Sequence, residues 1–113
     1  MRVTYRKLVR DRIPEIIRDN GGQPATRILS QEDFRAALIA KLGEEAHEVS
    51  AAPAADLPGE LADVLEVLRA LAGAAGLTWA ELTDEAARKR AERGGFRDRI
   101  FLEHVDQDAP ADH

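Results

Sequence analysis

Two groups of carboxylates in this sequence have the spacing of a metal site. The first group is Glu44, Glu45 and Glu48, and the second is Glu60 and Asp63. At roughly 100° per residue, helix positions three or four apart share a face, so each group gathers its acids on one side. Carboxylates gathered in this way repel one another, and removing them from water costs free energy unless cations neutralise them. Because only oxygen donors are offered, the favoured ions are magnesium or manganese rather than zinc.

Most acidic runs on helices are solvated faces, and the apolar surroundings of these acids argue against that interpretation. Glu45 stands three residues after Leu42 and four before Val49, where the apolar stripe of the helix would otherwise place a leucine. The stripe itself consists of Phe34, Leu38, Leu42 and Val49. Glu60 and Asp63 lie on the most apolar helix of the chain, which offers them almost no solvated side. We therefore expect acids from both helices to face the space between them.

Capping signals and helix breakers define the helix that carries the first group. Ser30 followed by Asp33 is typical of a helix N-cap with an acidic first turn. This helix is expected to run to about Ala52, where Pro53 ends it. The short connection from there to Gly59 makes the next helix an antiparallel neighbour, which brings the two acidic groups together.

The helix after that connection, expected at about 59–75, is apolar on nearly every side and should be the central, buried one. Gly76 ends it, and Thr78 with Glu81 forms a capping box for a last helix. The remaining elements are expected as a helix at 12–20, the last helix at 79–93, and two short strands at 26–29 and 99–105 that pair with each other.

The fold class that results is all-α in the main, an antiparallel bundle of about four helices with two short terminal β-strands. The 113 residues have room for one domain, expected over 1–105 and followed by a disordered acidic tail at 106–113. Aromatic residues make up 4% of the chain, so the core must consist mainly of Leu, Ile, Val and Ala. A core this light often needs a second copy of the chain to complete its burial.

Composition excludes several other classes of function. The chain has no cysteine, which removes disulfides, thiolate zinc sites and cysteine nucleophiles together. A formal net charge of -5 argues against a nucleic-acid binder, for which a basic face is usual. No apolar run approaches the roughly 18 residues of a membrane span, and the first residues lack an apolar leader, so a cytoplasmic location is expected.

With these acids the sequence resembles the all-α nucleoside triphosphate pyrophosphohydrolases of the MazG-like superfamily, whose signature is E-E-x-x-E followed at a distance by E-x-x-D. The letters of that signature are here Glu44, Glu45, Glu48, Glu60 and Asp63. The segments KLVRDRIP at 7–14 and ERGGF at 92–96 are similar to the ends of a predicted house-cleaning subgroup of that superfamily. The resemblance therefore covers residues 5 to about 103.

The resemblance implies a magnesium-dependent enzyme that hydrolyses a nucleoside triphosphate, canonical or noncanonical, to the monophosphate and pyrophosphate. It implies that Glu45, Glu48, Glu60 and Asp63 are magnesium ligands, with manganese as a substitute ion. It also implies that Glu44 completes this catalytic group by binding a further ion or orienting the attacking water. Members of the superfamily form homodimers or homotetramers, which agrees with the light core.

Basic side chains are needed near the phosphates of such a substrate. Lys89 and Arg93 lie one turn apart on the last helix and are the first candidates, although a solvated basic helix end would look the same. Lys7, Arg10 and Arg12 form a second basic cluster, which the resemblance implies could fold over the triphosphate.

Three alternatives stay open from the sequence. Residues 41–51 also resemble phosphoribosyl-ATP pyrophosphohydrolase of histidine biosynthesis, an enzyme of the same chemistry. A di-iron carboxylate bundle would need two E-x-x-H pairs, and Glu44 with His47 supplies one. The third alternative is a non-catalytic helical dimer that acts as a binding or regulatory module, with its acids solvated.

Overall fold

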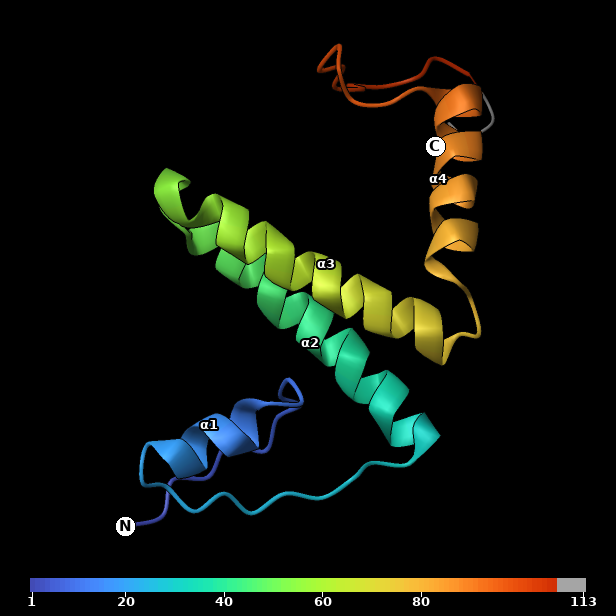
Figure 1. The fold of residues 1–113 in the computed structure, drawn as a ribbon. Helices are drawn as coiled ribbons and strands as arrows, with labels where there is room; N and C mark the ends of the chain where they lie inside the picture. The colour runs from blue at the N-terminus through green and yellow to red at the C-terminus, as the bar shows by residue number, and fades with distance from the viewer. Residues whose placement is uncertain (108–113) are drawn as a thin grey trace. The chain divides into compact units, whose positions relative to one another are not determined.

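The computed structural model describes residues 1–107, and all its regular elements are helices (Figure 1). The elements are α1 at Ile13–Asp19, α2 at Gln31–Ala51, the short 3-10 helix η1 at Ala54–Asp56, α3 at Leu57–Ala74 and α4 at Trp79–Arg93. The four predicted helices are therefore confirmed, with α3 beginning two residues early. None of the helices in the described chain is long and apolar enough to cross a bilayer.

The chain divides into two compact units, the first covering residues 1–77 and the second beginning at Thr78. Each unit is described by itself. That one domain spans 1–105 stays a prediction. The acidic tail predicted at 106–113 lies, beyond Gln107, outside the described residues.

The predicted N-caps form as expected. The Ser30 hydroxyl accepts a hydrogen bond from the Asp33 N–H at 3.2 Å and so satisfies a donor that the first turn of α2 leaves open. Thr78 and Glu81 form the complete capping box at the start of α4. The Glu81 N–H donates to the Thr78 hydroxyl at 3.1 Å, and the Thr78 N–H donates to the Glu81 carboxylate at 3.0 Å.

The end of α3 is set by Gly76, as predicted. Its φ of +77° lies in the left-handed region, where a residue with a Cβ is strained. The Leu77 N–H donates to the Ala72 carbonyl at 2.8 Å and the Gly76 N–H to the Gly73 carbonyl at 3.0 Å, which is the Schellman pattern. These bonds satisfy carbonyls that the last turn would otherwise leave unpaired.

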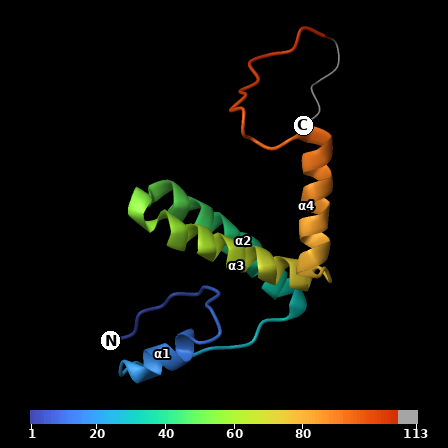
Figure 2. The same cartoon turned by 45° about the horizontal axis from the view of Figure 1, so that its top comes forward.

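In the first unit α2 and α3 lie side by side and antiparallel, with η1 in the short connection between them (Figures 1 and 2). Leu38 on α2, with Val67 and Ala72 on α3, is buried in this hairpin. The predicted stripe of α2 is confirmed, since its four apolar members are all buried or half-buried. The prediction that α3 is the central, buried helix is wrong for the single chain, because Leu61 is 51% exposed and Leu65 is exposed as well.

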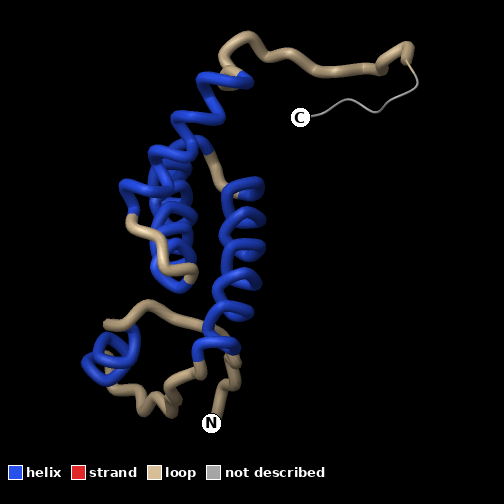
Figure 3. The backbone as a smooth tube through the Cα atoms, turned by 90° about the vertical axis from the view of Figure 1, so that its right-hand side faces the viewer, coloured by secondary structure: helices blue, strands red, loops and turns tan. Residues whose placement is uncertain are grey.

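The two predicted strands do not form. No strand occurs within residues 1–107 (Figure 3), and both 26–29 and 99–105 are irregular. A strand exists only through ladder hydrogen bonds to a partner, and β-propensity depends on the packing that a sheet supplies. Between described residues, no backbone hydrogen bond outside the helices involves 26–29. The alternation of residue types alone was therefore insufficient to predict a strand.

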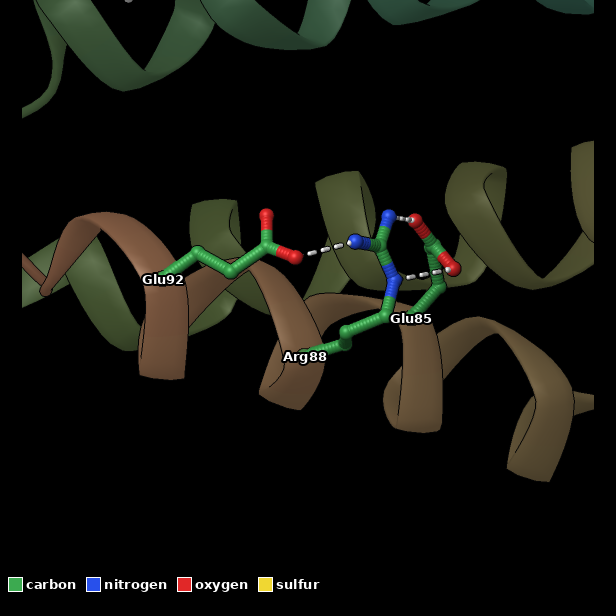
Figure 4. A network of polar contacts seen from close by, with 3 residues as sticks. All are labelled: Glu85, Arg88 and Glu92. Carbon is green, nitrogen blue, oxygen red and sulfur yellow. Dashed lines mark hydrogen bonds and ion pairs between the residues drawn. The ribbon is translucent and has the colours of Figure 1, made fainter.

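The second unit consists of α4 and the irregular segment after it, up to Gln107. On α4, Arg88 binds two acids of its own helix (Figure 4). It forms ion pairs with Glu85, three residues earlier, and with Glu92, four residues later, the latter at 2.8 Å. Ion pairs on an exposed helix are screened by water, so each of these contributes little to stability. They support a helix whose residues, as far as the structure describes them, are at most half-buried.

Candidate metal centre

Three of the predicted ligands meet between α2 and α3. Glu45, Glu60 and Asp63 each offer one carboxylate oxygen, and these oxygens all lie within 4.8 Å of one another. All three side chains are partly buried. The prediction that acids from both helices converge is confirmed for these three. No other group of three such residues in the described chain is this close together.

The position of Glu45 in the apolar stripe explains its burial. Its side chain is 14% exposed, whereas that of Glu44, one position away on the helix, is 53% exposed. The 100° step between neighbouring residues turns Glu45 toward α3 and leaves Glu44 at the solvated edge. The two acids therefore differ in environment, and Glu44 is available to a molecule that approaches from outside.

The surroundings of Glu60 disfavour the charged form of its carboxyl. Desolvation raises the pKa of its carboxyl above the ordinary value. Neighbouring negative charges raise this pKa further, in the order Asp63, Glu48, Glu45 and Asp56. Glu48, although exposed and outside the group of three, thus acts on the same centre. Its role as a ligand stays a prediction.

Lys41 is a member of this site that the sequence reasoning missed. Its ammonium lies 3.6 Å from carboxylate oxygens of both Glu44 and Glu45, and its side chain is only 21% exposed. The signal was present in the sequence, because Lys41 and Glu45 are four residues apart on one helix. Lys41 therefore neutralises part of the acidic group from within α2.

A second positively charged side chain at this site comes from a distant part of the sequence. The Arg10 guanidinium donates a hydrogen bond to Asp63 at 2.6 Å, across 53 residues of sequence. The other members of the predicted N-terminal basic cluster do not make such contacts. Arg12 pairs with Glu15 at 3.3 Å, and the ammonium of Lys7 lies 5.5 Å from the centre of a nearby tyrosine ring. The structure thus brings one of the three to the acids.

Lys89 and Arg93 lie on α4, in the second unit. Neither forms an ion pair with another described residue, in contrast to Arg88 on the same helix. They are therefore not neutralised by the acids of α4 in the way that Arg88 is. Their proximity to the metal ligands stays a prediction.

Comparison with known proteins gives one similarity. The chain is 54% identical over 50 residues to an uncharacterised protein of Mycolicibacterium smegmatis, and the match covers 44% of this chain and 51% of that protein. The chain thus spans about half the length of the curated relative it matches. No protein-family model matches the chain, and no solved structure gives a significant match.

Proposed function

We propose that this chain is a magnesium-dependent nucleoside triphosphate pyrophosphohydrolase, which converts a nucleoside triphosphate to the monophosphate and pyrophosphate. The observation that carries the proposal is the convergence of Glu45, Glu60 and Asp63, whose oxygens lie within 4.8 Å of one another. These residues come from the two helices that hold the two halves of the superfamily signature.

The donor set fits a hard divalent cation. Magnesium binds oxygens at about 2.0–2.1 Å, so two ligands on opposite sides of the ion are about 4.2 Å apart. Two neighbouring ligands in the same octahedral geometry are about 2.9 Å apart. Oxygens that lie within 4.8 Å of one another therefore reach one ion if each moves by about an ångström at most, which changes of carboxylate rotamer supply. Exposed acids are common without any ion, and the partial burial of this group distinguishes it from them.

Magnesium at this position, or manganese in its place, would supply charge neutralisation on the phosphate oxygens and a more acidic bound water. Glu45, Glu48, Glu60 and Asp63 would hold it. The solvated Glu44 would orient a water and accept its proton. The water oxygen then attacks the α-phosphorus, the bond to the oxygen that bridges to the β-phosphorus breaks, and pyrophosphate leaves with the electrons of that bond.

Positive side chains would hold the leaving phosphates. Lys89 and Arg93 are assigned this role because no acid of the described chain pairs with them, and Arg10 is assigned it because it already reaches the acids. Lys7 and Arg12 would complete the N-terminal basic segment. Charge-assisted bonds to phosphate are roughly twice as strong as neutral ones, so each contact would contribute to binding.

A homodimer, or a tetramer built from it, is part of the proposal. The α2–α3 hairpin buries few side chains in the single chain, and apolar residues on both helices, including Ile39, Leu61 and Leu65, remain exposed. Apolar surface removed from water stabilises by about 25 cal/mol per Å². A second copy that covers this face would supply the burial that one chain lacks.

The test is pyrophosphate release from a panel of canonical and modified nucleoside triphosphates, with phosphoribosyl-ATP included, in magnesium and in chelator. Magnesium-dependent release from one or more triphosphates is expected. Activity on phosphoribosyl-ATP alone would assign the histidine-biosynthesis reaction instead. Absence of release from every compound, together with absence of magnesium binding in calorimetry, would leave the binding-module alternative.

A further inference from the structure

The ion pair between Arg10 and Asp63 joins two groups to which the proposed function gives separate tasks. Arg10 belongs to the segment assigned to the phosphates, and Asp63 belongs to the metal ligands. The bond between them is 2.6 Å long, and the two side chains are 56% and 43% exposed. Within the described chain, this is the ion pair that links the N-terminal segment to the acidic group of α2 and α3.

The place of Arg10 in the chain allows it to leave Asp63. It lies before α1 in a segment without regular structure, so its side chain can turn away without breaking a helix. Its carbonyl accepts a hydrogen bond from the Ile13 N–H at 3.0 Å, which ties the backbone there but not the side chain. Lys41 differs in this respect, because the helix fixes it three and four residues from the acids it neutralises.

A guanidinium and a divalent cation make opposing demands on Asp63. Both need its negative charge, and a cation bound by the group of three would lie only a few ångströms from Arg10, where like charges repel. Phosphates offer Arg10 an alternative partner with a geometry that suits its planar fork of donors. The bound cation would therefore repel Arg10 from Asp63, and the substrate phosphates would offer it another ion pair.

Resting on the metal site of the proposed function, we infer that Arg10 competes with the divalent cation for Asp63 and is drawn off by the phosphates of the substrate. Magnesium and triphosphate then assist each other's binding through this one side chain. Such assistance is reciprocal, since each ligand raises the affinity for the other by the same factor. Arg10 is accordingly a positioning residue for the metal as well as a contact for the substrate.

The experiment is calorimetric titration of the full chain with magnesium alone, in wild type and in Arg10→Gln. If Arg10 competes with magnesium for Asp63, magnesium should bind Arg10→Gln up to about fivefold more tightly than wild type, because breaking a half-exposed ion pair lowers the affinity by no more than that factor. The matched control is Arg18→Gln, which removes the same charge from an exposed side chain at the end of α1. It is expected to leave the magnesium affinity unchanged.

The outcomes separate this inference from the function it rests on. Tighter magnesium binding in Arg10→Gln, with a higher KM for the triphosphate, supports competition, and loss of folding could not produce a gain in affinity. Equal or weaker binding in Arg10→Gln, with wild type binding magnesium normally, overturns the competition and leaves the metal site standing. Absence of binding in both proteins overturns the metal site and the competition together.

Discussion

Asp63→Asn tests the metal centre with the least change in shape. It removes one negative charge and keeps the volume of the side chain. Mutating a residue that hydrogen-bonds to a metal ligand usually lowers metal affinity or activity by about 10- to 100-fold. If Asp63 is itself a ligand, its loss should lower activity by at least as much. We expect kcat/KM to fall about 100-fold or more, which corresponds to about 2.7 kcal/mol.

The same substitution should leave the fold intact, and the structure sets the size of the effect. Asp63 loses its ion pair with Arg10, which at this exposure is worth up to about 1 kcal/mol. It also loses its repulsion with Glu60 and with Glu45, whose carboxylate oxygens lie within 4.8 Å of its own. The repulsion with Glu45 alone is at least about 0.9 kcal/mol in water. The lost repulsions therefore offset the lost attraction, and Asp63→Asn should be as stable as wild type or slightly more stable.

The assay combines pyrophosphate release with thermal unfolding in chelator, followed by circular dichroism. Asp63→Asn should unfold within about 4 °C of wild type, and added magnesium should no longer raise its Tm. Glu66→Gln is the control, because Glu66 is an exposed acid one turn further along the same helix. Full activity in Asp63→Asn, or an equal loss in Glu66→Gln, would refute the reasoning.

Three more predictions concern the residues around the centre. Lys89→Gln removes a charge-assisted contact worth about 1.5–3 kcal/mol, so steady-state kinetics should show KM for the triphosphate raised about tenfold or more; an unchanged KM excludes the contact. Leu65→Glu places a charge on the exposed apolar face and should turn a dimer into a monomer in analytical ultracentrifugation, whereas a monomeric wild type contradicts the proposed assembly. Hydrogen bonds from the backbone and hydroxyl of Thr78 lower the pKa of Glu81. The stabilisation that Glu81 contributes is therefore present above about pH 4.5 and is lost as the pH falls through the lowered pKa. Glu81→Gln should reduce the fall in Tm at acid pH, and an unchanged fall would assign it to other carboxylates.

The sequence predicted the helices well because their signals are local. A cap such as Ser30 or Thr78 acts within three residues, and a terminating glycine such as Gly76 acts within about five. The inward position of Glu45 followed from the same kind of reasoning, since the helical period relates it to the apolar residues of its own stripe. The sequence of α2 alone was therefore enough to predict that Glu45 faces inward.

What the sequence did not predict depends on partners far along the chain. The strand at 26–29 required a second strand to bond with, and alternation of residue types does not supply one. The contact between Arg10 and Asp63 spans 53 residues, and no periodicity relates the two positions. The exposure of Leu61 follows from how many neighbours α3 has, which its own apolar composition does not reveal.

The short span of the donors along the chain has a consequence for biosynthesis. The three converging acids lie between residues 45 and 63, within a hairpin that is complete by Leu77. Contacts between sequence neighbours close small loops and form quickly. We therefore expect a nascent chain to bring these three acids together while α4 is still inside the ribosome, so that the proposed metal centre forms before the proposed phosphate contacts of α4 have emerged.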